Sequence, residues 1–176
     1  MPRSSSPGSL KQSKTFRILI NTLFFLVIFW GIQTWQQRNM AAGVAPDFQS
    51  TLLDGATKKL SSYQGKPLIL HFWSTTCPIC RLEEDSISDL ARDKDTQILT
   101  VAFYSGGSNA VNSYLKNRKL THWPVILDPE GELGKKFGVF ATPSTFYIGP
   151  HGKIRYKTIG FTSKWGMKIR LWLAGL

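Results

Sequence analysis

The sequence predicts an α/β fold in which a mixed central sheet is flanked by helices and preceded by one amino-terminal transmembrane helix. Three observations support this prediction. Two nearly continuous apolar runs, residues 67–73 and 97–104, are typical of strands buried on both faces of a sheet. Helical patterns follow both runs, which indicates parallel strands joined by right-handed crossovers. A third apolar stretch, residues 16–36, is long enough to span a bilayer.

The composition is that of a folded and strongly basic protein. Hydrophobic residues make up 42% of the 176 residues, which argues against a disordered chain, and the net charge is +11. A basic surface can attract nucleic acid, anionic lipid or acidic proteins. Because the chain has neither zinc-finger spacing nor an RNA-binding signature, we expect no nucleic-acid partner and interpret the charge as solvated surface.

The chain divides into four segments. We expect residues 1–15 to be a cytoplasmic tail, residues 16–36 a transmembrane signal anchor, residues 37–45 a linker and residues 46–176 the folded domain. Basic residues and no acids precede the apolar stretch. The positive-inside rule therefore places the amino terminus in the cytoplasm and the domain on the periplasmic or extracytoplasmic side of a bacterial inner membrane.

Two other interpretations of residues 16–36 are a cleaved signal peptide and a buried core helix. Residues 40–45 include small side chains, but cutting after Ala45 would place Pro46 next to the cut, which is a poor cleavage site. The apolar character of the stretch on all sides and its separation from the domain argue against a core helix. We therefore expect a retained single-pass anchor.

The remaining elements follow in order along the domain. A short strand at 48–53 and a turn region at 60–65 precede the first buried strand. A helix begins at the CPIC sequence that follows this strand. Alternating strands on both sides of Gly149–Pro150–His151–Gly152 predict a hairpin. After the second buried strand, the predicted elements are a helix at 108–118, a strand at 123–127, a helical turn at 133–137, the hairpin strands at 144–148 and 153–159, and a helix at 163–173.

The only two cysteines, Cys77 and Cys80, form a C-x-x-C motif between a buried strand and the start of a helix. A disulfide between them closes a very small loop and would constrain the unfolded chain little, so a structural staple is a poor explanation. Free N–H groups at a helix amino terminus favour a thiolate. We therefore predict that Cys77 attacks disulfides and that Cys80, one turn away, resolves the mixed disulfide. Pro78 suits the first helical turn, where its missing N–H would be unpaired.

Metal binding and simple burial are the alternative explanations of the cysteine pair. Two thiolates can hold Cu(I) or Zn²⁺. Neither a second C-x-x-C nor a histidine at ligand spacing supports zinc, so we predict no metal site and no cofactor. Two buried cysteines that act as small apolar residues would explain neither their spacing nor their position.

A second candidate feature is Thr142–Pro143, directly before the strand at 144–148. Proline cannot donate a hydrogen bond within a sheet, so Pro143 marks the entrance of this strand. A cis bond there would expose the backbone of Thr142, which could then bind an extended substrate peptide passing Cys77. Most X–Pro bonds are trans, so the sequence alone does not predict the cis form.

Three segments of the domain resemble the thioredoxin superfamily: LILHFWSTTCPIC, FGVFATPSTFYIGPHGKIRY and GFTSKWGMKIRLWLAG. The similarity is greatest to the exported, membrane-anchored TlpA/ResA-like branch, and within it to protein disulfide oxidoreductases of the suppressor of copper sensitivity protein D type. The resemblance implies a thioredoxin-like fold, a cis Pro143, and a Cys77–Cys80 pair that cycles between dithiol and disulfide.

Two residues near the motif have more than one interpretation. The resemblance implies that Glu83 tunes the thiols, but an acid in the first helical turn also complements the helix dipole. His71 stands where cytoplasmic thioredoxins carry a buried acid. It can shuttle a proton, although a core histidine satisfied by hydrogen bonds is the simpler interpretation.

These observations lead to one expected function. We expect a thiol–disulfide oxidoreductase that exchanges disulfides with exported proteins and is linked to copper tolerance. Its expected partners are protein substrates with cysteines or disulfides, a membrane thiol–disulfide redox partner, and the inner membrane through residues 16–36. The alternatives are a disulfide reductase for cytochrome c maturation and a Cu(I)-binding module that uses the same two cysteines.

Overall fold

The computed structural model describes residues 14–176, and residues 1–13 of the predicted cytoplasmic tail lie outside this range. The chain separates into two compact units, Met1–Gln36 and Gln37–Leu176. The second unit contains every strand that the structure describes. It also contains both cysteines.

The first unit contains the helix α1 (Lys14–Gln37), which covers the predicted anchor. Its helical conformation agrees with the sequence prediction. Within residues 14–176, however, no helix combines the length and the apolar character that a membrane crossing needs. The predicted transmembrane anchor over residues 16–36 is therefore not confirmed. Arg17 and Asn21 place polar residues in the first half of α1 and shorten its apolar part.

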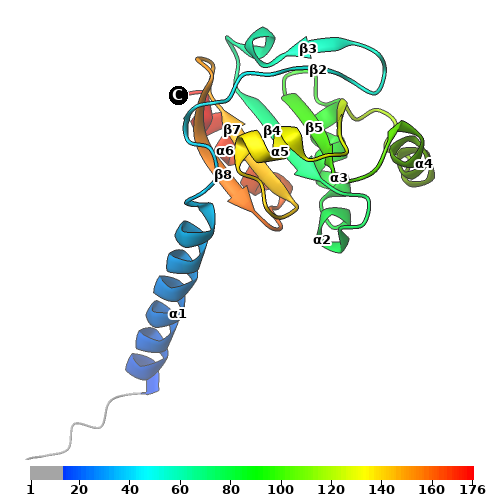
Figure 1. Cartoon of the computed structure of the whole chain (residues 1–176). Helices are drawn as coiled ribbons and strands as arrows, with labels where there is room; N and C mark the ends of the chain where they lie inside the picture. Colours follow the sequence, from blue (N-terminus) through cyan, green and yellow to red (C-terminus); the bar gives the residue numbers. More distant parts are fainter. Residues whose placement is uncertain (1–13) are drawn as a thin grey trace, which may run out of the picture. The chain divides into compact units, whose positions relative to one another are not determined.

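A six-stranded mixed sheet forms the centre of the second unit, with the strand order β1-β8-β7-β4-β5-β6. β4 pairs in parallel with β5, and β5 with β6, whereas β7 pairs antiparallel with both β4 and β8. A separate two-stranded ribbon, β2-β3, lies at one end (Figure 1). The strands are β1 (Gly43–Val44), β2 (Gln49–Thr51), β3 (Thr57–Lys59), β4 (Leu68–Trp73), β5 (Gln97–Phe103), β6 (Val125–Asp128), β7 (Ser144–Ile148) and β8 (Lys153–Ile159).

Helices cover both faces of this sheet, as the sequence predicts. α5 lies on one face and α6 on the opposite one (Figure 1). The helix expected after CPIC is divided into two, because Leu82 and Glu83 form a turn between α2 and α3. The helices of the second unit are η1 (Leu60–Tyr63, a 3₁₀ helix), α2 (Pro78–Arg81), α3 (Glu84–Arg92), α4 (Ser108–Arg118), α5 (Glu132–Phe137) and α6 (Lys164–Ala174).

The core consists of two layers, one on each face of the sheet. Because side chains alternate along a strand, Phe72 of β4 lies in one layer and its neighbour Trp73 in the other. Phe72 contacts the rings of Phe103, Phe137 and Phe146 at centroid distances of 5.7–6.4 Å. The layer of Trp73 also contains both cysteines, so the candidate site is attached to a well-packed core.

The segment expected to be a linker, residues 37–45, packs onto the second unit. Met40 and Ala45 are buried in the core layer of Phe72. β1 within this segment pairs with β8, and the N–H of Ala41 donates to the carbonyl oxygen of Phe137. These residues lack the apolar periodicity of a strand, which explains why the sequence did not reveal their place in the sheet.

Candidate active site

Cys77 lies at the junction between β4 and the short helix α2. β4 ends at Trp73, and the chain then turns so that the N–H of Cys77 donates to the carbonyl oxygen of Ser74. Cys77 has the extended conformation of an N-cap residue, with φ −83° and ψ 113°. Pro78 occupies the first turn, where no backbone N–H is needed. The sequence CPIC therefore begins the helix directly after the turn that follows β4.

Cys77 and Cys80 form a disulfide, and the motif directs the backbone N–H of Cys80 toward the first sulfur. The N–H of Cys80 donates to Cys77 Sγ at 3.1 Å. α2 is only four residues long, so this local N–H contributes more than a helix macrodipole can. A donor at this distance stabilises negative charge on Cys77 Sγ once the disulfide is reduced.

The Thr142–Pro143 bond is cis, as the resemblance implied, and it lies beside the disulfide. The carbonyl oxygen of Thr142 is 3.4 Å from Cys77 Sγ. The antiparallel pairing of β4 with β7 explains this proximity, since it places Phe72 opposite Ser144 at the ends of the two strands. Two segments that are far apart in the sequence thus meet at one sulfur atom.

A shallow pocket of about 350 Å³ opens next to Cys77. Its apolar side chains come from three separate parts of the chain: Ile79 is 44% exposed, Tyr104 53% and Phe140 56%. Ser74 and Thr142 also line this pocket, which has no charged residue in its lining. The pocket gives another molecule access to Cys77 and favours an apolar group beside the sulfur.

Glu83 is buried on the inner side of the motif, where it faces His71. The side chains of Glu83 and His71 are both fully buried, and Glu83 Oε2 lies 3.8 Å from His71 Nε2. Burial raises the pKa of Glu83 to about 7, although the N–H of Thr162, which donates to Glu83 Oε1, opposes this shift. Burial lowers the pKa of His71 to about 3. Both environments therefore favour the neutral form of each side chain.

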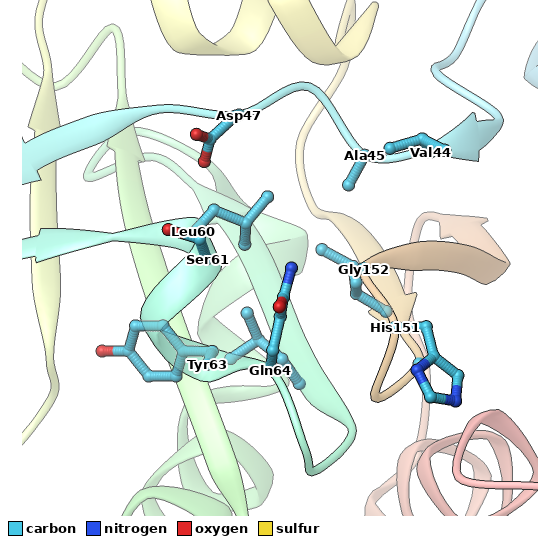
Figure 2. Close-up of a pocket in the computed structure, with 12 residues that line it drawn as sticks. Val44, Ala45, Asp47, Leu60, Ser61, Tyr63, Gln64, His151 and Gly152 are labelled. Atoms are coloured by element: carbon cyan, nitrogen blue, oxygen red, sulfur yellow. The ribbon is translucent and has the colours of Figure 1, made fainter.

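A second cavity, of about 210 Å³, shares no lining residue with the cysteine pocket, and Figure 2 shows the residues around it. Its lining includes Asp47, Tyr63, Gln64 and His151, which come from the β2 and η1 region and from the turn of the hairpin. None of the predicted site residues lines it. We therefore assign the candidate active site to the cysteine pocket alone.

The structure brings the predicted site residues together in two groups. Cys77, Cys80, Pro78 and Thr142–Pro143 surround the pocket and the disulfide, whereas Glu83 lies beneath them in the core. Several residues of the site were not predicted. Phe140 was within reach, because it lies in the FGVFATPSTFYIGPHGKIRY segment that resembles thioredoxins and precedes Thr142 by two residues. No sequence signal places Ile79 and Tyr104 in the pocket, or Thr145 and Thr162 around His71 and Glu83.

Residues 42–157 match the AhpC/TSA family. The chain is 38% identical over 123 residues to a "Thioredoxin-like protein" of Haemophilus influenzae, covering 69% of this chain and 72% of that protein. It is 28% identical over 160 residues to "Thiol-disulfide oxidoreductase ResA" of Bacillus thuringiensis, covering 88% and 92%. The crystal structure of the pneumococcal exposed lipoprotein thioredoxin from Streptococcus pneumoniae superimposes with a TM-score of 0.66 at 28% identity, covering 73% of this chain and 99% of that one.

The raised pKa of Glu83 predicts a specific pH dependence of stability. Between its ordinary pKa of 4.5 and about 7, the unfolded chain has lost the Glu83 proton while the folded chain keeps it. The free energy of unfolding therefore falls as pH rises through this window. Glu83→Gln removes this loss, so the variant should gain about 3 kcal/mol relative to the wild type between pH 4.5 and 7.

Urea unfolding of both oxidised proteins at several pH values measures this difference. His71 stays neutral in the folded protein across this window, because burial lowers its pKa to about 3. A stability difference that stays constant from pH 4.5 to 8 would contradict a raised pKa for Glu83.

Proposed function

The chain belongs to the AhpC/TSA family of thioredoxin-like proteins and is a thiol–disulfide oxidoreductase, and on this basis we propose that Cys77 and Cys80 exchange disulfides with exported proteins. The surroundings of the Cys77 sulfur carry the proposal. Cys77 Sγ receives the N–H of Cys80, lies beside the carbonyl of Thr142, and faces an open pocket. An inert, purely structural disulfide needs none of these features.

The reaction proceeds by two exchanges at sulfur. In the reduced protein, the Cys77 thiolate attacks one sulfur of a substrate disulfide, and the other substrate sulfur leaves as a thiolate. A mixed disulfide now joins Cys77 to the substrate. The Cys80 thiolate then attacks Cys77 Sγ, which forms the intramolecular disulfide and releases the substrate in its reduced form. Run in reverse, the same steps oxidise a substrate dithiol.

The surroundings of Cys77 favour an extended peptide as the substrate. The Thr142 carbonyl lies beside the sulfur, where it can accept a hydrogen bond from the substrate backbone. Ile79, Tyr104 and Phe140 supply apolar contact area next to it. We expect the N–H of Cys80 to stabilise each thiolate that forms on Cys77.

Substrate trapping tests this function. Cys80→Ala removes the thiol that resolves the mixed disulfide but leaves Cys77 able to attack. We expect the variant to accumulate covalent complexes with extracytoplasmic proteins that run as larger species without reductant and dissociate with dithiothreitol. Cys77→Ala is the matched control and should capture nothing, because the attacking sulfur is absent.

The same experiment distinguishes disulfide exchange from the alternative of a Cu(I)-binding module. Within residues 14–176, no three His, Cys, Asp or Glu side chains lie together as a metal site, but two thiolates are sufficient for Cu(I). Failure of Cys80→Ala to trap any partner, together with tight Cu(I) binding by the reduced wild type, would replace the exchange function with metal binding.

The more specific roles rest on sequence similarity alone. The resemblance of residues 160–174 to proteins of the suppressor of copper sensitivity type supports a link to copper tolerance. A reductase for cytochrome c maturation uses the same chemistry at the cysteines. A strain that lacks the protein distinguishes the two roles, because copper-sensitive growth supports the first and loss of c-type cytochromes supports the second.

We also propose that the domain works outside the cytoplasm, at the outer face of a bacterial inner membrane, where a membrane redox protein would exchange electrons with it. The basic residues before α1 and the apolar sequence of α1 support this compartment. A retained and a cleaved leader deliver the domain to the same side, so the proposal does not require a retained membrane-spanning helix.

Labelling of intact spheroplasts tests this location. After mild reduction, a membrane-impermeant maleimide should modify Cys77 without lysis of the cells. Modification that appears only after lysis would place the domain in the cytoplasm and contradict the proposal. A cytoplasmic protein with an exposed cysteine serves as the control for intact cells.

A further inference from the structure

The buried pair of His71 and Glu83 lies in the same core layer as the cysteines. Alternation along β4 places His71 on the face of Ile69 and Trp73, and this layer also contains Cys77 and Cys80. Glu83 follows the motif by one turn, and its N–H donates to the carbonyl oxygen of Cys80 at 3.1 Å. A change of charge on this pair therefore occurs close to the sulfur that the exchange reaction releases.

The hydrogen bonds of the pair leave one position for a proton. His71 Nδ1 is 2.9 Å from the hydroxyl oxygen of Thr145, and Glu83 Oε1 accepts from the N–H of Thr162. The two remaining atoms, His71 Nε2 and Glu83 Oε2, are buried, face each other at 3.8 Å and have no other hydrogen-bond partner among the described residues 14–176. Without a proton between them, two lone pairs would meet in a site that water does not reach.

The burial of both side chains decides where this proton resides. Burial raises the pKa of Glu83 and lowers that of His71, so the neutral acid and the neutral imidazole are the favoured forms. The carboxyl O–H of Glu83 then points toward His71 Nε2, and the Nδ1–H of His71 donates to Thr145. This arrangement gives every polar atom of the pair a partner after a small approach of the two side chains.

We propose that His71 is a positioning residue that holds Glu83 protonated beneath the cysteine pair, so that opening the disulfide does not create a second buried negative charge. The proposal rests on the exchange function of Cys77 and Cys80. When an incoming thiolate attacks Cys77 Sγ, the sulfur–sulfur bond breaks and the electron pair leaves on Cys80 Sγ. The Cys80 thiolate then takes up one proton from solvent, while Glu83 keeps its own.

The coupling follows from Coulomb repulsion in a buried layer. Cys80 is only 4% exposed, so its thiolate is poorly solvated. An ionised Glu83 in the same layer would destabilise that thiolate, and a neutral Glu83 does not. Loss of the Nε2 acceptor removes a hydrogen bond from the protonated form of Glu83 and therefore lowers the pKa of Glu83.

Several other titratable groups, on β7, on α6 and along α3, do not change their protonation state in the pH range in which Glu83 titrates. Tyr147 on β7 stays neutral, because burial raises its pKa to about 12. Arg170 on α6 is a guanidinium and stays positive. Farther along α3 and at its C-cap, hydrogen bonds lower the pKa values of Asp89, through Lys164, and of Asp93, through the N–H of Asp95, so both remain ionised.

The first test measures the carboxyl of Glu83 directly. Infrared titration of the full chain in its oxidised form follows the protonated carboxyl band, which Glu83→Gln identifies by its loss. In the wild type this band should disappear with a midpoint near pH 7. In His71→Asn, whose amide can still reach Thr145 but lacks Nε2, the ionisation constant should rise roughly tenfold and the midpoint should fall by about one pH unit.

His151→Asn is the matched control, because this histidine is exposed in the hairpin turn, and it should leave the midpoint unchanged. An identical midpoint in the wild type and in His71→Asn would overturn the proposal, and so would a Glu83 that is already ionised at pH 5. If His71→Asn does not fold, Thr145→Val removes the partner of Nδ1 instead and should shift the midpoint in the same direction.

The second test uses the thiol–disulfide equilibrium with glutathione as a function of pH. The wild-type profile should change slope near the midpoint of Glu83, by up to tenfold in the equilibrium constant per pH unit, which corresponds to 29.6 mV. The change of slope should move to lower pH in His71→Asn and vanish in Glu83→Gln. A profile that is the same in all three proteins would contradict the coupling.

The two tests separate the two proposals. A protein that never equilibrates with glutathione refutes the exchange function, while the infrared titration still decides whether His71 controls Glu83. If the protein equilibrates normally with glutathione but the midpoint of the carboxyl band is the same in His71→Asn as in the wild type, the exchange function stands and the positioning role is refuted.

Discussion

The hydrogen bond from the N–H of Cys80 to Cys77 Sγ is the interaction on which the rest of the site depends. It fixes the attacking sulfur against the first turn of α2 and supplies partial positive charge where a thiolate must form. The pocket exposes this sulfur, and the Thr142 carbonyl, which also lines the pocket, lies 3.4 Å from it. Without that donor, the same two cysteines would be an ordinary short-range disulfide.

The sheet makes this arrangement possible by joining two distant segments. The antiparallel register of β4 and β7 pairs His71 with Thr145 and Phe72 with Ser144, so the CPIC turn and the Thr142–Pro143 turn leave the sheet at the same end. The same register brings the Thr145 hydroxyl to the ring of His71. The position of Thr142 beside Cys77 and the surroundings of His71 in the core therefore depend on one strand pair.

Much of the domain was predictable because its elements carry local signals. The hairpin strands 144–148 and 153–159 and the helix 108–118 have the bounds that their periodicity indicated. The cysteine motif was noted from its spacing and the Thr142–Pro143 pair through the resemblance to thioredoxins, and the structure places Thr142 beside Cys77. The contact of Glu83 with His71 and Thr162 was not, since it depends on strand register and on a loop 79 residues away along the chain. The membrane span was predicted from hydropathy alone, and the structure does not support it.

The most direct test of this account is the pH dependence of alkylation of Cys77 in the fully reduced protein, with Cys80→Ala used to follow Cys77 alone. If backbone donors hold the sulfur as an anion, its rate of reaction with iodoacetamide should reach half its maximum well below pH 8.5, the ordinary pKa of a cysteine thiol. A midpoint at or above pH 8.5 would mean that the fold does not activate Cys77, and would contradict the central claim.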